Sequence, residues 1–334
     1  INVAYNSTII KYSLSLSSIM TRKWQFTSTR NAYGKKLLEL GRKHKEIVVL
    51  DADSKTSTQS ILFEKEFPDR FFNLGIQEAN MISMAAGFAS TGLVPFVSAF
   101  SVFITGMVYN QIRQSIAYSK LNVKLTGTHA GLTVGEDGAT HQMVEDISLM
   151  NALPNMVVVA PADTIELEKT MDALMEWHGP SYTRLYRVET PVVTKESDEF
   201  ELGKGYILED GTDITIIAYG IMVSRALEAR DILNNKGIFA RVVNMPTIKP
   251  LDRKLILKCA SETKGIVVAE EHSVLCGLGT LISSVVCEHK PVPVLKVGVL
   301  DIFGMSGKGY EILDIYGLTS ERIANAAEKL MTFK

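Results

Sequence analysis

Two histidines and an aspartate lie within one glycine-rich stretch of the chain, residues 128–142, as His129, Asp137 and His141. Glycines allow positive φ angles and let the backbone approach a ligand closely. The stretch follows a short β-like run, and α/β proteins bind their ligands at the carboxyl ends of strands. Imidazoles and a carboxylate are suited to holding sugar hydroxyls and phosphates, so we expect a polar binding site here.

A metal site is not expected in this stretch. The two imidazoles are twelve residues apart, which is not the i, i+4 spacing of zinc ligands on a helix, and no third ligand is obvious. A second metal candidate is Glu209-Asp-Gly211 followed by Asn234 and Asn235. It approaches the Gly-Asp-Gly…Asn-Asn pattern that binds diphosphate through Mg²⁺. The first glycine is missing and a strand is expected after Gly211, so we predict no metal–diphosphate site within this chain.

Glu78 is a second candidate for chemistry, in the sequence Asn73-Leu-Gly-Ile-Gln-Glu78. Gly75 precedes it and the apolar stretch Met81–Phe88 follows, which predicts a strand-to-helix junction. A carboxylate at that point is stabilised by the helix dipole alone. Alternatively, the apolar stretch excludes water and fits the carboxylate for proton transfer. Spacing leaves both interpretations open.

Two aromatic and two basic residues are further candidates. Phe100 and Phe103 follow a strand and precede a helix-like segment. Aromatic side chains there usually belong to the core, but they can also stack on a flat heteroaromatic ring. Arg184 and Arg187 could clamp a phosphate, or they could lie at a solvated strand end. The residue types favour neither interpretation.

The elements that must position these groups alternate between strand-like and helix-like patterns from Arg30 onward. We expect strands at 47–50, 95–97, 123–125, 156–159, 213–218, 240–244, 265–269 and 294–299, and helices at 222–234, 274–287 and 320–331. Such alternation predicts the α/β class, with two tandem domains that each contain a mostly parallel sheet flanked by helices. We place the domains at residues 21–190 and 205–334, with a linker over the surface at 191–204.

Composition narrows the class further. The chain has 334 residues, of which 46% are hydrophobic and 22% charged, with a net charge of −2. No basic stripe and no membrane-length apolar run is evident, so we expect neither nucleic acid nor a membrane as partner. Cys259, Cys276 and Cys287 are expected to be buried in a protein of the reducing cytoplasm. Residues 1–20 lack the features of a signal peptide and are expected to form a disordered leader.

Together these motifs resemble the carboxyl-terminal two-thirds of transketolase, from about Thr21 to the end. The chain is more closely similar to the separate C-terminal subunit of split transketolases. The motif ending at Glu78, the block from His129 to His141, and Ala160-Pro-Ala-Asp163 occur in the family's order and at its spacing. The resemblance implies a pyrimidine-binding domain followed by a transketolase C-terminal domain.

The resemblance also implies roles around the cofactor thiamine diphosphate. Glu78 matches the catalytic glutamate that bonds N1′ of the aminopyrimidine and promotes its imino tautomer, which activates thiazolium C2. Asp53 matches an aspartate at the cofactor and subunit interface. Phe100 and Phe103 match aromatic residues that pack on the pyrimidine ring.

For the substrate, the resemblance implies that Asp137 and His141 hold the hydroxyls of the donor sugar, with His141 also counted as catalytic. The matching positions for the sugar phosphate are Arg30, Ser57, His129 and Arg187.

This chain departs from the family pattern at two places. Ala79 stands where transketolases usually have a histidine after the glutamate. Gly106 replaces an expected third aromatic residue, and Tyr109, one turn later, is a candidate substitute.

The implied activity is transfer of a two-carbon ketol unit between ketose and aldose phosphates in the pentose phosphate pathway. The implied partner is an N-terminal subunit that carries the diphosphate–Mg²⁺ domain, in a heterotetramer in which this chain also associates with itself. Three alternatives remain: half of a 1-deoxyxylulose-5-phosphate synthase, the β subunit of a 2-oxoacid dehydrogenase, and a non-catalytic scaffold subunit. The preferred sugars are left open.

Overall fold

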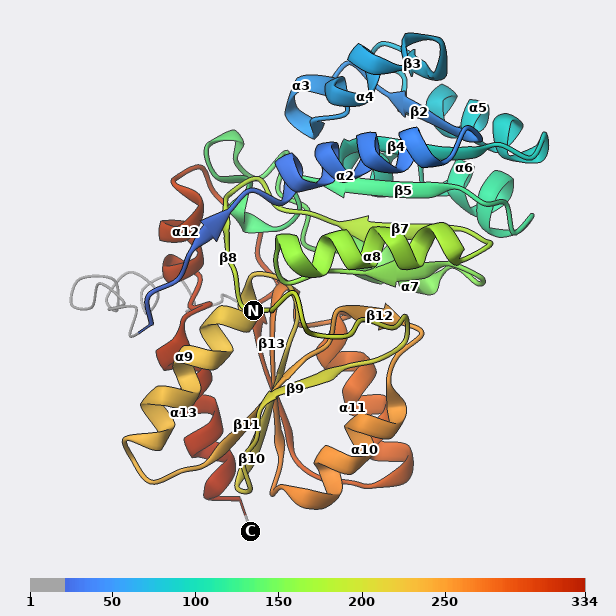
Figure 1. Cartoon of the computed structure of the whole chain (residues 1–334). Helices are drawn as coiled ribbons and strands as arrows, with labels where there is room; N and C mark the ends of the chain where they lie inside the picture. Colours follow the sequence, from blue (N-terminus) through green and yellow to red (C-terminus); the bar gives the residue numbers. More distant parts are fainter. Residues whose placement is uncertain (1–21, 334) are drawn as a thin grey trace, which may run out of the picture.

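The computed structural model describes residues 22–333, so the expected leader lies outside the described residues. Two sheets, each flanked by helices, lie one above the other and are joined by a long connection (Figure 1). This arrangement confirms the predicted α/β class with mostly parallel sheets.

The first sheet has seven strands, which run parallel except at one edge. Their order is β12 (Thr247–Lys249), β6 (Val157–Val159), β7 (Ser181–Arg184), β5 (Lys124–Thr128), β4 (Val94–Phe100), β2 (Ile47–Asp51) and β3 (Phe71–Asn73). The strand β12 comes from the second half of the chain and pairs with β6 in antiparallel fashion.

Helices cover both faces of this sheet, as buried parallel strands require. One face carries α2 (Thr29–Lys43), α4 (Ile61–Glu66) and α8 (Thr164–Glu176). The other carries α5 (Glu78–Ser90), two π-helical segments η2 (Phe103–Met107) and η3 (Ile112–Ala117), and α7 (Asp146–Ala152). The short elements α3 (Lys55–Thr58), η1 (Pro68–Arg70) and α6 (Tyr109–Gln111) complete this half.

The second sheet has five strands, in the order β14 (Val294–Val299), β13 (Ile266–Ser273), β10 (Ile214–Ala218), β11 (Ala240–Asn244) and antiparallel β9 (Tyr206–Glu209). The helices α9 (Met222–Asn234) and α13 (Ser320–Met331) cover one face, and α10 (Arg253–Glu262) and α11 (Leu278–His289) the other (Figure 1). The short helix α12 (Gly309–Ile315) reaches back to the first half.

Two expectations about local structure need correction. The helix expected from residue 274 begins at Leu278, because the buried carboxylate of Glu270 accepts the amides of Leu278 and Gly279 at 2.8 and 2.9 Å and so caps the helix there. Only Cys259 of the three cysteines is buried, whereas Cys276 and Cys287 are exposed.

The connection between the halves is more ordered than a surface linker. It begins with β8 (Thr190–Pro191), which pairs with β1 (Phe26–Thr27). Thr194 is buried, and its hydroxyl donates to Asp163 Oδ1 at 2.8 Å. Asp163 also accepts the amide of Thr194 at 2.7 Å. The connection is therefore fixed to the first half by a short strand pair and by hydrogen bonds to Asp163.

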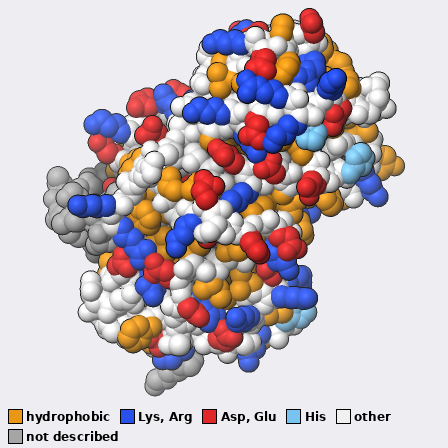
Figure 2. All heavy atoms as spheres, viewed as in Figure 1, with side chains coloured by type: hydrophobic (Ala, Val, Ile, Leu, Met, Phe, Trp, Pro, Cys, Tyr) orange, Lys and Arg blue, Asp and Glu red, His pale blue; other side chains and the backbone are white. Residues whose placement is uncertain are grey.

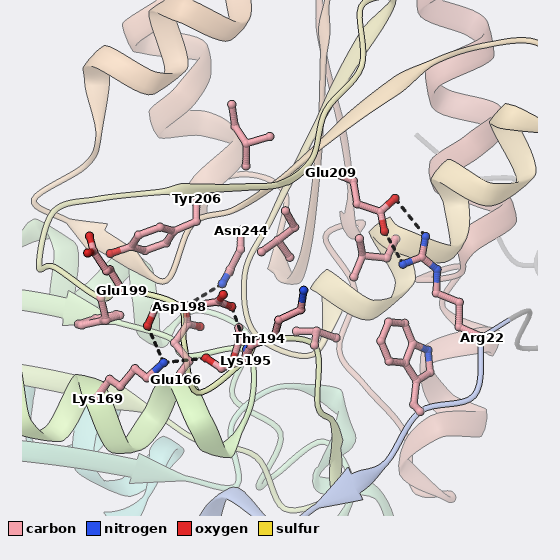
Figure 3. A pocket seen from close by; sticks show the side chains of 16 residues that line it. Arg22, Glu166, Lys169, Thr194, Lys195, Asp198, Glu199, Tyr206, Glu209 and Asn244 are labelled. Carbon is pink, nitrogen blue, oxygen red and sulfur yellow. Dashed lines mark hydrogen bonds and ion pairs between the residues drawn. The ribbon is translucent and has the colours of Figure 1, made fainter.

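A pocket of about 520 Å³, lined by both polar and apolar side chains, lies beside this connection (Figure 3). Glu166 projects toward it from α8; it is buried, and it accepts a hydrogen bond from Asn244 Nδ2 at 2.7 Å. Burial raises the pKa of Glu166 to about 8. None of the residues that resemble the transketolase site lines this cavity.

On the face drawn in Figure 2, acidic and basic side chains are interspersed over both halves. None of the helices within residues 22–333 combines the length and the apolar composition that a membrane span requires.

Candidate active site

Candidate residues gather where the parallel strands of the first sheet end. The strands β2, β4, β5 and β7 share one direction, so their carboxyl ends meet at one edge of the sheet (Figure 1). Parallel α/β sheets bind ligands at this edge. The loop that follows β5 is the glycine-rich stretch singled out by its histidines.

The backbone of this loop turns sharply. His129 has a φ of 55°, an unusual conformation for a residue with a side chain, and Gly131 follows with a φ of 77°. Ala130 N donates to Leu185 O at 3.0 Å, and Gly131 N donates to Met143 O at 2.8 Å. These bonds, donated by the two residues that follow His129, hold the strained residue in place, and such strain is often found at functional sites.

An aromatic–imidazole cluster forms one part of the site. The ring of His129 stacks on Phe100 with centroids 3.7 Å apart. The rings of His141 and Phe103 are nearly perpendicular, with centroids 5.5 Å apart, and the centroids of Phe100 and Phe103 are 6.0 Å apart. The structure therefore brings the two predicted phenylalanines together with the two predicted histidines. It also shows that one face of Phe100 is already covered by an imidazole.

His129 is a neutral imidazole at ordinary pH. Its pKa is lowered to about 3, first by burial and then by the positive charges of Arg30 and Arg187. Its Nδ1 lies 2.9 Å from Thr128 Oγ1. His141, which is only half-buried, has its Nδ1 2.9 Å from Thr140 Oγ1.

An arginine cluster forms the second part. Arg30, in the first turn of α2, donates to Ser57 O at 2.8 Å and to Arg187 O at 3.0 Å. Arg187 Nη1 donates to Val134 O, and the same guanidinium lies 3.6 Å from Asp137 Oδ1. Four predicted substrate positions are thus in direct contact.

The cluster combines two guanidinium groups with two carboxylates. Burial, followed by the nearby charge of Arg187, lowers the pKa of Arg30. Glu136, which we did not predict as a site residue, pairs with Arg187 at 2.7 Å. Glu136 immediately precedes Asp137, and that adjacency was the signal available in the sequence.

Glu78 is the first residue of α5 and is 5% exposed. Among residues 22–333 its carboxylate has no hydrogen bond or ion pair. Its two oxygens are nevertheless not among the fully buried atoms that lack a partner, so they keep some contact with solvent. The structure therefore places Glu78 at the predicted strand-to-helix junction and leaves its acceptor atoms available to a group outside the described chain.

Asp53 lies apart from these clusters. It is exposed and has a φ of 61°. Its backbone amide donates to Asn73 Oδ1 at 3.0 Å, and its carboxylate accepts a hydrogen bond from Asn73 Nδ2 at 3.2 Å. Gly106 is exposed, and Tyr109 is half-buried against the core.

The comparisons with known families decide the identity of this arrangement. Residues 26–192 match the model of the transketolase pyrimidine-binding domain, and residues 203–323 match that of the transketolase C-terminal domain. A protein of Methanocaldococcus jannaschii, named for the transketolase C-terminal section, is 48% identical over 90% of this chain and 95% of its own length. The chain belongs to the transketolase family.

Two further relatives show which part of a transketolase this chain corresponds to. Transketolase of Rattus norvegicus is 37% identical over 91% of this chain but only 49% of its own length. The match is thus half of that enzyme, rather than the expected two-thirds. A solved structure of a split-gene transketolase, described as an inactive β4 tetramer, is 47% identical, with a TM-score of 0.86, over 92% of this chain and 99% of its own.

Arg184 of this transketolase-family chain is neither a phosphate clamp nor a solvated strand end. It is fully buried, and it donates to Asp146 Oδ1 at 2.8 Å and to Glu271 O at 2.7 Å. Asp146 also accepts the hydroxyl of Tyr182 at 2.7 Å. Because Glu271 lies in β13, Arg184 joins the two halves of the chain.

Within the described residues, no group of three or more histidine, cysteine or acidic side chains is arranged to hold a metal ion.

Proposed function

We propose that this chain is the C-terminal subunit of a transketolase that moves a two-carbon ketol unit between ketose and aldose phosphates with the aid of thiamine diphosphate. The observation that carries the proposal is the position of Glu78 at the amino end of α5, where the residue is 5% exposed and its carboxylate has no partner among the described residues. Its position within the transketolase pyrimidine-binding match supports the role of bonding N1′ of the aminopyrimidine.

The residues present fit the pyrimidine end of this cofactor. Glu78 offers an unpaired acceptor, and Phe100 and Phe103 offer aromatic surface beside the loop. Because His129 covers one face of Phe100, we assign the larger share of pyrimidine packing to Phe103. When bound, thiamine diphosphate supplies the carbon nucleophile that the protein itself lacks. In the proposed reaction Glu78 holds a proton at its carboxylate and orients the pyrimidine, and Asp53 lies at the cofactor and subunit interface.

The sugar phosphate would bind at the arginine cluster. Arg30 and Arg187 present two neighbouring guanidinium groups to which a phosphate dianion would bond, at Arg187 in place of the exposed Glu136 carboxylate. Arg30 lies in the first turn of α2, where the helix dipole also favours an anion. Ser57 and the neutral imidazole of His129 complete this part, and neutrality lets His129 either donate or accept a hydrogen bond.

The donor's hydroxyls would bind at Asp137 and His141. Both side chains remain partly exposed, so they are accessible to a sugar. His141 would also hold or move a proton at a ring nitrogen during cleavage of the donor. The protein's contribution is therefore orientation and proton transfer at the edge of the first sheet.

We further propose that activity requires an N-terminal partner subunit, which would bind the diphosphate and Mg²⁺. Two findings support this: the chain corresponds to half of the rat enzyme, and the solved split-gene relative, a β4 tetramer, is described as inactive. The proposed assembly is a heterotetramer, working in the pentose phosphate pathway of the cytoplasm.

The test is Glu78→Gln in the complex assembled with the partner, assayed with xylulose 5-phosphate as donor and ribose 5-phosphate as acceptor. We expect turnover to fall by about 10²–10⁴-fold, the usual contribution of a proton-transfer group. Glu46→Gln, at an exposed position, is the control and should keep full activity. Near-normal turnover of Glu78→Gln would exclude the proposed role.

The partner requirement has its own test. The chain alone, supplied with thiamine diphosphate and Mg²⁺, should transfer nothing, and robust activity would contradict the two-subunit proposal. Consumption of pyruvate with release of carbon dioxide by the complex would favour a synthase or dehydrogenase half. Cofactor binding without any transfer would favour a scaffold.

A further inference from the structure

The loop that carries the proposed substrate residues rests on a carboxylate from the second half of the chain. Glu271, in β13, is fully buried and accepts the amide of Thr133 at 2.6 Å. Gly131 lies against the same carboxylate, and a methyl group at that position would overlap it. The loop backbone therefore packs directly on the Glu271 side chain, with no room for an intervening atom.

This contact lies one residue away from the arginine cluster. Thr133 is followed by Val134, whose carbonyl accepts a hydrogen bond from Arg187 Nη1. The carbonyl of Arg187 in turn accepts from Arg30 Nη2 at 3.0 Å. A displacement of the turn at residues 132–134 would consequently move both guanidinium groups.

The backbone of Glu271 is anchored by a buried arginine. Its carbonyl accepts from Arg184 Nη2 at 2.7 Å, and Arg184 pairs with the buried Asp146. Burial raises the pKa of Glu271 to about 7. A buried carboxyl costs more stability than an apolar side chain of similar size, so folding alone gives little reason for an acid here.

We propose that Glu271 is a positioning residue that holds the turn at 132–134 and, through Val134, keeps Arg187 in place for the sugar phosphate. The substrate part of this inference rests on the proposed function, whereas the hold on the loop does not. Glu271 contacts neither of the two arginine side chains of the cluster, so it acts on the phosphate only through the loop.

The chain offers a matched control. Glu270 is the adjacent residue of β13, is equally buried, and likewise accepts backbone amides, but those amides belong to α11. Glu270→Ala and Glu271→Ala each remove one buried carboxylate bonded to backbone N–H groups. Only Glu271→Ala removes a bond to the active-site loop.

The first measurement is amide hydrogen exchange of the full chain, resolved at Thr133. In Glu271→Ala we expect exchange there to be about tenfold faster, the effect of losing one buried hydrogen bond. Glu271→Gln keeps an oxygen acceptor and should restore protection, and Glu270→Ala should leave Thr133 unchanged. Should Glu271→Ala fail to fold, Glu271→Asp, which retracts the acceptor by one methylene, serves instead. Equal exchange at Thr133 in wild type and in the Glu271→Ala variant, or in Glu271→Asp where that variant replaces it, would overturn the proposal.

The second measurement is kinetic, on the complex with the partner subunit. Glu271→Ala should raise the KM for xylulose 5-phosphate about tenfold while leaving the KM for unphosphorylated xylulose near the wild-type value. Equal rises in both KM values would overturn the link to the phosphate. If the wild-type complex transfers no ketol unit, the proposed function fails, and the exchange experiment alone decides whether Glu271 holds the loop.

Discussion

Removing either partner of the Arg184–Asp146 pair should destabilise the protein strongly. Both side chains are fully buried, and Nη1 lies 2.8 Å from Oδ1. Arg184→Met leaves the Asp146 carboxylate buried with the Tyr182 hydroxyl but without a countercharge. Asp146→Asn leaves the Arg184 guanidinium buried without a countercharge. A buried charge that loses its partner typically costs about 3–5 kcal/mol, and we expect each single variant to lose this much free energy of unfolding.

The double variant Asp146→Asn/Arg184→Met separates the pair's interaction from its surroundings. It leaves no unpaired charge, so its loss should be smaller than the sum of the two single losses, with a coupling energy of about 2 kcal/mol. Urea unfolding at pH 7, followed by far-UV circular dichroism and by the fluorescence of Trp24 and Trp177, measures all four proteins. Because Arg184 also bonds to Glu271 O in the other half, both probes should shift together.

Two outcomes would refute this reasoning. A loss below about 1 kcal/mol in either single variant would mean that water reaches the pair and solvates the remaining charge. Losses that simply add in the double variant would mean that the two groups stabilise the fold independently, and Arg184 would then be open again to a role in ligand binding.

Three further predictions concern titration and packing. Burial lowers the pKa of His129 to about 3, so the unfolded chain binds this proton near pH 6.5 and the folded chain does not. The free energy of unfolding should therefore decrease as the pH is lowered from 6.5 to 3, by up to about 1.4 kcal/mol per pH unit. In urea unfolding His129→Gln should weaken this pH dependence, and an unchanged dependence would contradict the prediction. Burial raises the pKa of Glu166 to about 8, so the wild type loses stability from pH 4.5 to 8 as the unfolded carboxyl ionises. In Glu166→Gln the new amide can pair with a reoriented Asn244, and the Tm of this variant relative to wild type should be higher at pH 8 than at pH 5. The same Tm difference at both pH values would count against the raised pKa of Glu166. Gly220→Ala places a methyl group against the Tyr186 hydroxyl at a φ of 56° and should cost about 2–3 kcal/mol in urea unfolding, whereas a loss near zero would show that Tyr186 moves aside.

The periodic pattern of apolar residues predicted the bounds of two helices in the second half. The bounds of α9 and α13 agree with the expected helices at 222–234 and 320–331. Long amphipathic or buried helices carry a periodic signal along their whole length. The start of α11 could not be predicted in this way, because its cap, Glu270, comes from a strand eight residues earlier.

Part of the candidate site was predicted from the sequence, and part of it was not. Arg30, Ser57, Asp137 and Arg187 do meet, since loops at the carboxyl ends of parallel strands converge. Their roles in binding remain predictions. Arg184 differs from Arg187 by three positions in sequence, yet it is buried because β7 is an inner strand and its neighbour Asp146 supplies a countercharge. No local pattern distinguishes the two arginines.

The contribution of the second half to the loop could not be predicted from local pattern either. Glu271 is more than a hundred positions from Thr133, and nothing in the sequence around either residue indicates their contact. Such contacts depend on how the two sheets are placed, which is a property of the complete fold. Sequence reasoning therefore identified the groups that face the ligand better than the groups that hold them.

The strand β12 has a consequence for attempts to divide this protein. It leaves the second half and completes the edge of the first sheet, pairing Thr247 with Val159 and Lys249 with Val158. A fragment that ended within the connection at 191–204 would lose β12 and leave the apolar strand β6 with unpaired backbone groups. Exposed edges of this kind pair readily with other chains and lead to aggregation. The halves match separate family domains but are interlocked in shape, and a soluble first half would have to carry a graft of β12 with it.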